Sequence, residues 1–261
     1  MLKMGINELG DIKIMAEEII IIDNVVFSAD RKTLLGLYTE KEEYTIPYGV
    51  TAIAEGAFES NEGLKRMVIP GSVKIIGENA FFGCMDLESV IISDGVTEIR
   101  EGAFRVCECL KSIVVPDSVQ IIGPWAFSAC TSLESVIMSN NVSQIGEYAF
   151  HDCTSLTSFA IPANITAIPK GIFAECLSLE SVTIPESVTK ICHDAFVNCK
   201  KLTSIKIPAG VTEIEFEAIL GCPCAEQILK DHLHLFTDRG VPCAEEIKRD
   251  YPHLFAEGEN K

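Results

Sequence analysis

The sequence predicts a solenoid of repeated 23-residue units that is mostly β, with short strands and tight turns. Three observations lead to this prediction: apolar residues recur at a fixed step, strand-like segments end at proline, and 48% of the residues are hydrophobic. A single unit of this length cannot bury its own apolar face. Stacked units share a continuous core instead, in which each register forms a column of like side chains.

Four apolar registers carry the repeat, and each advances by 23 residues. Phenylalanine fills the first at Phe58, Phe81, Phe104, Phe127, Phe150, Phe173 and Phe196, with Ile219 in the next place. Cysteine fills the second at Cys84, Cys107, Cys130, Cys153, Cys176, Cys199 and Cys222. Leucine fills the third at Leu64, Leu87, Leu110, Leu133, Leu156, Leu179 and Leu202. Isoleucine fills the fourth at Ile53, Ile76, Ile99, Ile122, Ile145, Ile168, Ile191 and Ile214. We therefore expect eight repeats in residues 44–222.

Each unit should contain two short extended segments and one tight turn. The V-x-I spacing, as in Val90-Ile91-Ile92, is typical of a strand. Proline cannot donate a backbone hydrogen bond, so it should end that strand. It recurs at Pro47, Pro70, Pro116, Pro162, Pro185 and Pro208. A second extended piece follows, such as residues 118–122, and we expect the A-F-x-x-C segment to form a tight helical turn.

The two ends of a solenoid expose core and backbone edges, so we expect a cap at each end. In residues 1–43, the runs 18–27 and 33–38 are apolar and strand-like, and residues 28–32 between them form a turn, which predicts a β-hairpin. Residues 223–236 and 242–255 match at nine of fourteen positions, and each copy starts with proline followed by acidic residues. This pattern predicts two short helices within a helical cap, residues 223–261. Residues 256–261 should fray.

The repeat resembles the BspA-like type of leucine-rich repeat, whose units read I-P-x-x-V-x-x-I-G-x-x-A-F-x-x-C-x-x-L. Residues 69–87 and 184–199 come close to this pattern, and the resemblance covers residues 44–222. The asparagine ladder of common leucine-rich repeats is absent, because Gly95, Ser118 or Asn141 lies near its place. The resemblance implies a leucine-rich-repeat solenoid that binds proteins, often at bacterial surfaces in adhesion or cell contact. It names no ligand.

Composition excludes some functions. The 21 Lys and Arg against 38 Asp and Glu give a net charge of −17, which argues against a nucleic-acid partner. No stretch approaches the ~20 apolar residues of a membrane span. The first residues of the chain as given lack the pattern of a signal peptide. That absence and the eleven cysteines favour a cytoplasmic protein, whereas the resemblance favours a secreted or surface protein. The location stays open.

A partner-binding surface is predicted on the strands. If the V and I of V-x-I point inward, the residue between them points outward. Those outward residues are mostly large aliphatics and form what we call the apolar strip: Val68, Ile91, Val114, Ile137 and Ala160. Beside it runs a serine stripe, which includes Ser89, Ser112, Ser135 and Ser158. A row of exposed apolar residues often marks an interaction surface, although β-branched residues also simply suit strands.

Catalytic and metal sites are weakly supported. Cys224, Cys243, His234 and His253 recur in the C-terminal copies and could form a zinc set, a disulfide or plain packing; their spacing does not suit structural zinc. His151 and His193 lie in turns without recurring, and no catalytic motif accompanies them. We predict no catalytic residue, no metal and no cofactor.

Together these observations predict a non-enzymatic protein-protein interaction module that presents a strand-lined sheet. Adhesion or cell-surface recognition follows only from the resemblance. The alternatives are an intracellular scaffold, or a protein that uses the C-terminal Cys and His residues for metal or thiol chemistry. The partner is a protein of unknown identity, and self-association stays open.

Overall fold

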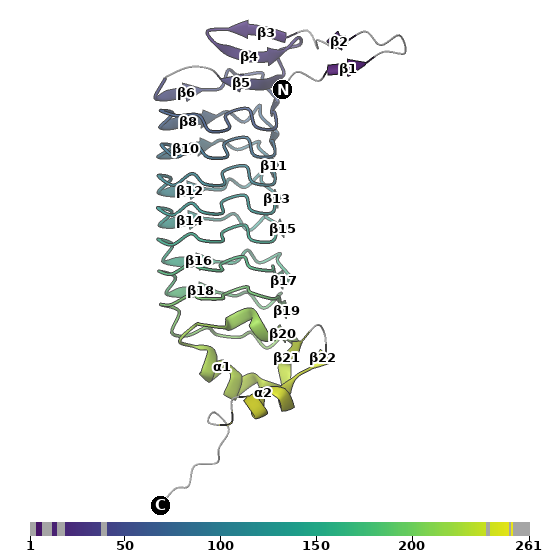
Figure 1. Cartoon of the computed structure of the whole chain (residues 1–261), viewed down its shortest axis with the longest axis vertical. Coiled ribbons are helices and arrows are strands. Elements are labelled where there is room, and N and C mark those ends of the chain that lie inside the picture. Colours follow the sequence, from purple (N-terminus) through teal and green to yellow (C-terminus); the bar gives the residue numbers. More distant parts are fainter. Residues whose placement is uncertain are drawn as a thin grey trace, which may run out of the picture.

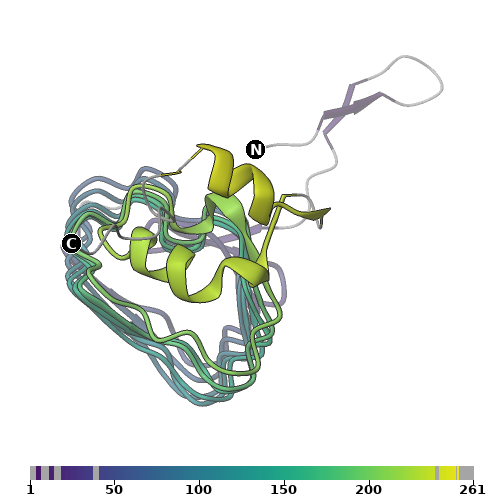
Figure 2. The ribbon, with the colours of Figure 1, turned by 90° about the horizontal axis from the view of Figure 1, so that it is seen from below.

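Each 23-residue unit makes one turn of a solenoid, and the turns stack into a rod with a strand-lined side (Figure 1). The computed structural model describes residues 4–6, 12–14, 19–37, 41–238, 241–250 and 252. Seen along the axis, the turns superimpose in a roughly triangular outline (Figure 2). The predicted β-rich solenoid of 23-residue units is therefore confirmed. The boundaries proposed at residues 43 and 222 stay predictions.

The longer strands line one side of the rod, where V-x-I was predicted to be extended. They are β6 (Glu43–Thr45), β8 (Arg66–Ile69), β10 (Ser89–Ile92), β12 (Ser112–Val114), β14 (Ser135–Ile137), β16 (Ser158–Ala160) and β18 (Ser181–Thr183). They form three parallel sheets, β6–β8–β10, β12–β14 and β16–β18, and paired strands are in register, as in the pairing of Ile91 with Val68 and of Val114 with Ile137. Equivalent residues of successive units therefore stand side by side.

The second extended piece of each unit is a two- or three-residue strand on another side of the rod (Figure 1). These strands are β7 (Ala52–Ile53), β9 (Ile75–Ile76), β11 (Glu98–Ile99), β13 (Ile121–Ile122), β15 (Gln144–Ile145), β17 (Ala167–Ile168), β19 (Lys190–Ile191) and β20 (Glu213–Glu215). Each contributes one inward isoleucine of the fourth register, which is less than 9% exposed throughout.

The short-strand sheet is divided between β15 and β17. In two earlier turns, the N–H of Gly123 donates to the carbonyl of Ile99 and that of Gly146 to the carbonyl of Ile122, each one turn before, at 2.7 and 2.8 Å. Pro169 holds the corresponding position and has no N–H to donate. At the same level Phe159 lies 5.0 and 4.8 Å from the rings of Phe150 and Phe173, which are 6.1 Å apart. The break between β15 and β17 therefore coincides with the loss of a backbone donor at Pro169 and with the packing of the bulky Phe159 ring against both neighbouring rings.

The A-F-x-x-C segment is a run of β-turns in the structure, so the expected helical turn is wrong. Alternate N–H groups have different targets: Phe82 donates to the carbonyl of Asn79, whereas Phe81 donates to Ala103 of the next unit. Left-handed residues flank each phenylalanine two positions away, as at Asn79 (φ 50°) and Gly83 (φ 70°). The turn therefore adds to the ladder between units, which a helix could not do.

The columns predicted from the sequence form one core that runs through the rod. The phenylalanine rings of neighbouring units stack at 4.6 to 6.1 Å between centroids. Each cysteine of the second register donates from Sγ to the carbonyl of the phenylalanine 26 residues earlier, at 2.8 to 3.2 Å. Packing, not bridging, therefore explains this column, and all eleven cysteines are free.

The N-terminal cap contains more strands than predicted. β3 (Ile19–Ile22), β4 (Val25–Ser28) and β5 (Thr33–Leu37) form an antiparallel meander, and β5 then pairs in parallel with β7. The run treated as one strand is itself a hairpin, because Asp23 and Asn24 both take positive φ, as a two-residue hairpin loop requires. β1 (Met4–Ile6) and β2 (Ile12–Ile14) form a further antiparallel pair. Glu18 and Tyr38 lie outside the described residues.

The C-terminal cap contains the predicted helices, α1 (Ala225–His232) and α2 (Ala244–Asp250). Around them lie η1 (Phe216–Ile219), η2 (Leu233–Leu235), β21 (Phe236–Asp238) and β22 (Val241–Pro242). β21 pairs in parallel with β20, so fully buried Phe236 continues the isoleucine column. Residues 253–261, including the tail expected to fray, lie outside the described part.

Candidate functional site

The apolar strip lies on the outer face of the long strands. Ile91, Val114 and Ile137 are 59%, 53% and 64% exposed, because alternate residues of a strand point to opposite faces. Their neighbours in sequence point inward: Val90 and Ile113 belong to the core. At the two ends of the strip, Val68 is half-buried and Ala160 is exposed. The strip therefore has the outward orientation that the V-x-I pattern predicted.

The serine stripe is also exposed at Ser89, Ser112, Ser135 and Ser158. Ser112 pairs in register with Ser135, and Ser158 with Ser181. Each serine stands two residues before a member of the apolar strip and so shares its face of the sheet. Small side chains here leave the strip accessible from that side.

Acidic residues stand on both sides of the strip, in two columns. The first column lies three residues before outward positions of the long strands and includes Glu88, Glu134 and Glu180. The second column lies three residues after outward positions and includes Asp94, Asp117 and Glu186. All six side chains are exposed. The first column also contains two basic residues, Lys65 before Val68 and Lys111 before Val114, so its charge alternates along the strip. The second column comes from the loops after the strands, and only the fold shows that these loops border the same face.

The stacked A-F-x-x-C turns, which we call the turn ridge, carry an aromatic cluster that the sequence analysis did not identify. Trp125 and Tyr148 hold equivalent left-handed positions of adjacent units, and their rings stack at 4.2 Å. Arg105 lies over the Trp125 ring at 5.2 Å, and Lys170 over the Tyr148 ring at 5.8 Å. Both rings are half-buried. The signal in the sequence was two aromatic residues exactly one repeat apart, in a position that otherwise holds glycine, asparagine or aspartate.

His151 packs edge-on against this cluster, with its ring 5.7 Å from Trp125. Its Nδ1 atom lies 3.5 Å from Oγ of Ser128, and burial lowers the pKa of His151. Ser128 is only 2% exposed, so a substrate could not reach its hydroxyl. This contact is part of the packing of the turn ridge.

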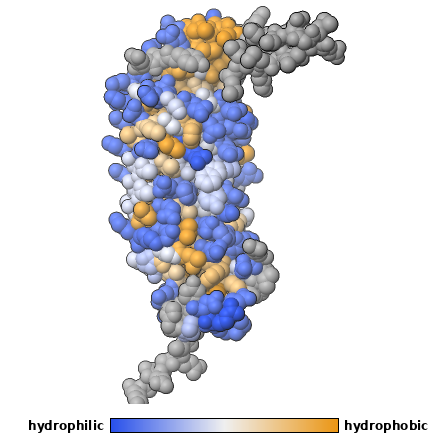
Figure 3. Space-filling view, viewed as in Figure 1, coloured by the Kyte–Doolittle hydropathy of each residue, from blue (hydrophilic) through white to orange (hydrophobic). Residues whose placement is uncertain are grey.

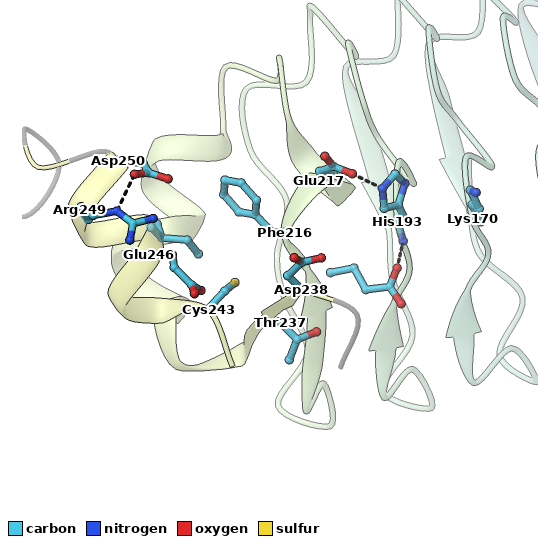
Figure 4. A pocket seen from close by; sticks show the side chains of 12 residues that line it. Lys170, His193, Phe216, Glu217, Thr237, Asp238, Cys243, Glu246, Arg249 and Asp250 are labelled. Atoms are coloured by element: carbon cyan, nitrogen blue, oxygen red, sulfur yellow. Dashed lines mark hydrogen bonds and ion pairs between the residues drawn. The ribbon is translucent and has the colours of Figure 1, made fainter. Parts of the chain in front are cut away.

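A cavity of about 490 Å³ lies between the last turns and the C-terminal cap, and its lining includes His193, Glu217, Asp238 and Cys243 (Figure 4). His193 Nδ1 lies 2.7 Å from Asp194, and its Nε2 forms an ion pair with Glu217. Ligand atoms of these three residues lie within 4.8 Å of one another, the one such group found in the described residues. Each ring nitrogen already lies beside a carboxylate of the chain itself.

Glu215 lies beside this group and receives hydrogen bonds from Lys190 at 2.8 Å and from the N–H of His193 at 2.6 Å. Burial by itself raises the pKa of Glu215, but these two hydrogen bonds outweigh burial and hold the pKa below its ordinary value. The carboxylate therefore stays charged and connects β20 with β19 and with His193, in the two turns nearest the cap.

The C-terminal Cys and His set is not brought together as a metal site in the described residues. Cys224 and Cys243 are buried, His234 is exposed, and none of them belongs to a group with metal-binding geometry. His253 lies outside the described part. Burial raises the pKa of Cys243, which favours the neutral thiol over the thiolate that binds metals.

Most of the visible face in Figure 3 is hydrophilic, and a hydrophobic patch lies at the N-terminal end over β3 and β4. Ile19, Ile21 and Ile22 are 51%, 64% and 39% exposed there. No helix in the part of the chain that the structure describes is long and apolar enough to cross a membrane.

A family model described as the BspA type leucine-rich repeat region matches residues 37–130 and 97–226, with six copies. A leucine-rich repeat protein of T. pallidum is 34% identical, over 68% of this chain and 86% of that chain, with a TM-score of 0.64. One from Bacteroides ovatus is 27% identical, over 75% of this chain and 61% of that chain, with a TM-score of 0.55. No curated protein matches the chain.

Proposed function

The chain belongs to the BspA-type leucine-rich repeat family, and from this premise we propose that it is a non-enzymatic module whose protein partner contacts the apolar strip. The carrying observation is the exposure of Ile91, Val114 and Ile137, each above one half, on three successive long strands of the same side of the rod (Figure 1). Removing such side chains from water on binding contributes ~25 cal/mol for each Å² of apolar area. Nothing in the fold requires three consecutive large aliphatics to face outward.

The non-enzymatic part of the proposal is supported by the geometry of the titratable residues. Ser128, the nearest hydroxyl to His151, is buried. His193 lies between Asp194 and Glu217, so each of its ring nitrogens is beside a carboxylate rather than a candidate nucleophile. Both arrangements are consistent with a packing role.

Adhesion or cell-surface recognition is the setting that the family favours, and an intracellular scaffold is the alternative. The alternative has its own support, since all eleven cysteines are free thiols. Ten of them are buried or half-buried, which would also protect them outside a cell. Labelling of intact source cells with an impermeant reagent decides between the two: labelling supports surface recognition, and its absence supports the scaffold.

The test of the module is a comparison of partner capture by two double variants. Ile91→Glu with Ile137→Glu places two charges in the strip and should abolish capture. Met85→Glu with Leu177→Glu makes the same chemical change at 53% and 40% exposed positions away from the strip, and should leave capture unchanged. Circular dichroism checks that both variants fold. Equal capture by the strip variant and the wild type would overturn the proposed interface.

A further inference from the structure

We propose that the occupant of the apolar strip is an amphipathic α-helix with basic flanks, which lies along the solenoid axis. This inference rests on the proposed function and adds the chemistry of the partner. Three features carry it: the spacing of the strip, the charge on either side of it, and the small residues beside it.

The spacing of the strip matches a helix. One strip residue stands on each turn. β12 and β14 are paired by hydrogen bonds, whereas β10 contacts β12 and β14 contacts β16 without a hydrogen-bonded ladder between them. At ~4.8 Å between strands, the three steps from Ile91 to Ala160 cover about 14 Å. A helix presents apolar residues alternately three and four positions apart, which is about 5.3 Å per contact and about 16 Å over three steps. The difference of ~1.5 Å is within the reach of side-chain adjustment.

An extended peptide does not match. Its same-face side chains repeat every ~6.7 Å, so three steps along the axis cover about 20 Å and overshoot the strip by more than one strand spacing. A peptide that runs across the axis, parallel to the strands, would contact a single turn and leave the other strip residues exposed. Spacing therefore favours a helix over a strand for a partner that covers Ile91, Val114 and Ile137 together.

The charge beside the strip matches basic flanks. Acidic residues stand three residues away on both sides, which is at most about 10 Å along an extended chain. A helix with its side chains is ~10–12 Å across, so lysine or arginine side chains on its flanks can extend to these carboxylates. In the first column Glu88 and Glu134 alternate with Lys65 and Lys111, so the excess of acidic over basic side chains lies in the second column. The second carries Asp94 and Asp117, whose carboxylates accept hydrogen bonds from Ser118 and Ser139 and so are fixed in place.

The serine stripe leaves room for the helix. The side chains between the strip and the first acidic column are small and exposed, so they do not project beyond the strip. They are Ser89, Ser112, Ser135 and Ser158. Larger residues in this place would hold a helix away from the aliphatic side chains. The net charge of −17 adds long-range attraction for a basic partner.

Synthetic peptides test the inference directly. The probe is a helix of about 18 residues with leucine on one face and lysine elsewhere, fluorescently labelled. A scrambled peptide of the same composition keeps the charge and loses the apolar face, and an alternating Leu-Lys peptide keeps both but is extended. We expect the helical probe to bind at least about tenfold more tightly than either, with a gain in helicity by circular dichroism. Affinity should fall as salt is raised.

Variants of the protein locate the contact. Ile91→Glu with Ile137→Glu should weaken the helical probe about tenfold, although the added charges attract a basic peptide. Glu88→Gln with Glu134→Gln should weaken it about threefold and reduce the salt dependence. Met85→Glu with Leu177→Glu is the control and should not weaken it. If the alternating or the scrambled peptide binds as tightly as the helical probe or more tightly, the proposal that the occupant is a helix is wrong.

The failure of this inference differs from failure of the proposed function. If the natural partner is captured through the strip but the helical probe does not bind, the helix is wrong and the interaction surface stands. If the strip variant captures the partner as well as the wild type does, the proposed interaction surface itself is wrong. Binding of the probe at another place would not rescue the proposed function.

Discussion

Truncation of Phe127 to alanine should lower the free energy of unfolding by about 4–5 kcal/mol, near the upper end of the range for buried phenylalanine. The ring is fully buried and stacks on Phe104 and Phe150, at 5.3 Å from each. Each stacked pair is worth about 0.5–1.5 kcal/mol beyond area burial. Phe58 ends the phenylalanine column: it stacks on Phe81, and its other aromatic neighbour, Tyr44, is tilted and 6.5 Å away rather than stacked. Phe58→Ala should therefore cost about 1 kcal/mol less than Phe127→Ala.

A double-mutant cycle isolates the contribution of the column. Phe104 and Phe127 are in contact, so their truncations should be non-additive by about 0.5–1.5 kcal/mol. Phe58 and Phe127 are three units apart, and their truncations should add to within about 0.5 kcal/mol. The second pair is the control for general loosening of the rod.

Urea unfolding should be followed by two probes. Far-ultraviolet circular dichroism reports the whole rod, and the fluorescence of Trp125, the sole tryptophan, reports the central units. Coincident transitions justify a two-state free energy, which repeat proteins do not always obey. Additivity within about 0.3 kcal/mol for Phe104 and Phe127 would refute the view that the rings form one coupled column.

Three further predictions follow from the same contacts. Gly77→Ala should cost about 1–3 kcal/mol in urea unfolding, because its Cβ would lie 2.6 Å from the backbone carbonyl oxygen of Ile53; an unchanged midpoint would contradict this. In native protein a thiol reagent should modify Cys109, the exposed thiol, well before the buried column, and rapid modification of all eleven would contradict the packing. Burial raises the pKa of Cys130 from 9.0 to about 12, so between these values the folded state holds a proton that the unfolded state has lost. Stability therefore falls as pH rises through this window, and Cys130→Ala should make the slope shallower by about 1.4 kcal/mol per pH unit.

The columns could be predicted because a solenoid translates sequence period directly into contact. Phe81 and Phe104 are 23 residues apart and stack at 5.0 Å, with no intervening choice of topology. Local exceptions were harder. The hairpin turn at Asp23 and Asn24 has a sequence signal that an apolar run on both sides concealed. The sheet break at Pro169 needed the knowledge that this position donates a hydrogen bond to the preceding turn.

The candidate site divides in the same way. Strand alternation alone indicated that Ile91 and Ile137 point outward, since their neighbours belong to the periodic core. The second acidic flank could not be seen, because Asp94 and Asp117 lie in loops whose direction depends on how each strand ends. The cavity between His193 and the cap joins residues from β20, β21 and α2, and its existence depends on how the cap docks. The 23-residue repeat contains no information about how the cap docks on the last turn.

The sequence by itself determined the solenoid, its four core columns and the outward face of its strands, because each is a nearest-neighbour property repeated along the chain. Only the tertiary structure decided what happens where the repeat stops. The cap strand β21 places Phe236 on the isoleucine column, and the cap helices close the cavity beside Glu217. These contacts join segments of unlike sequence, and their geometry follows from packing against a unique end rather than from any period.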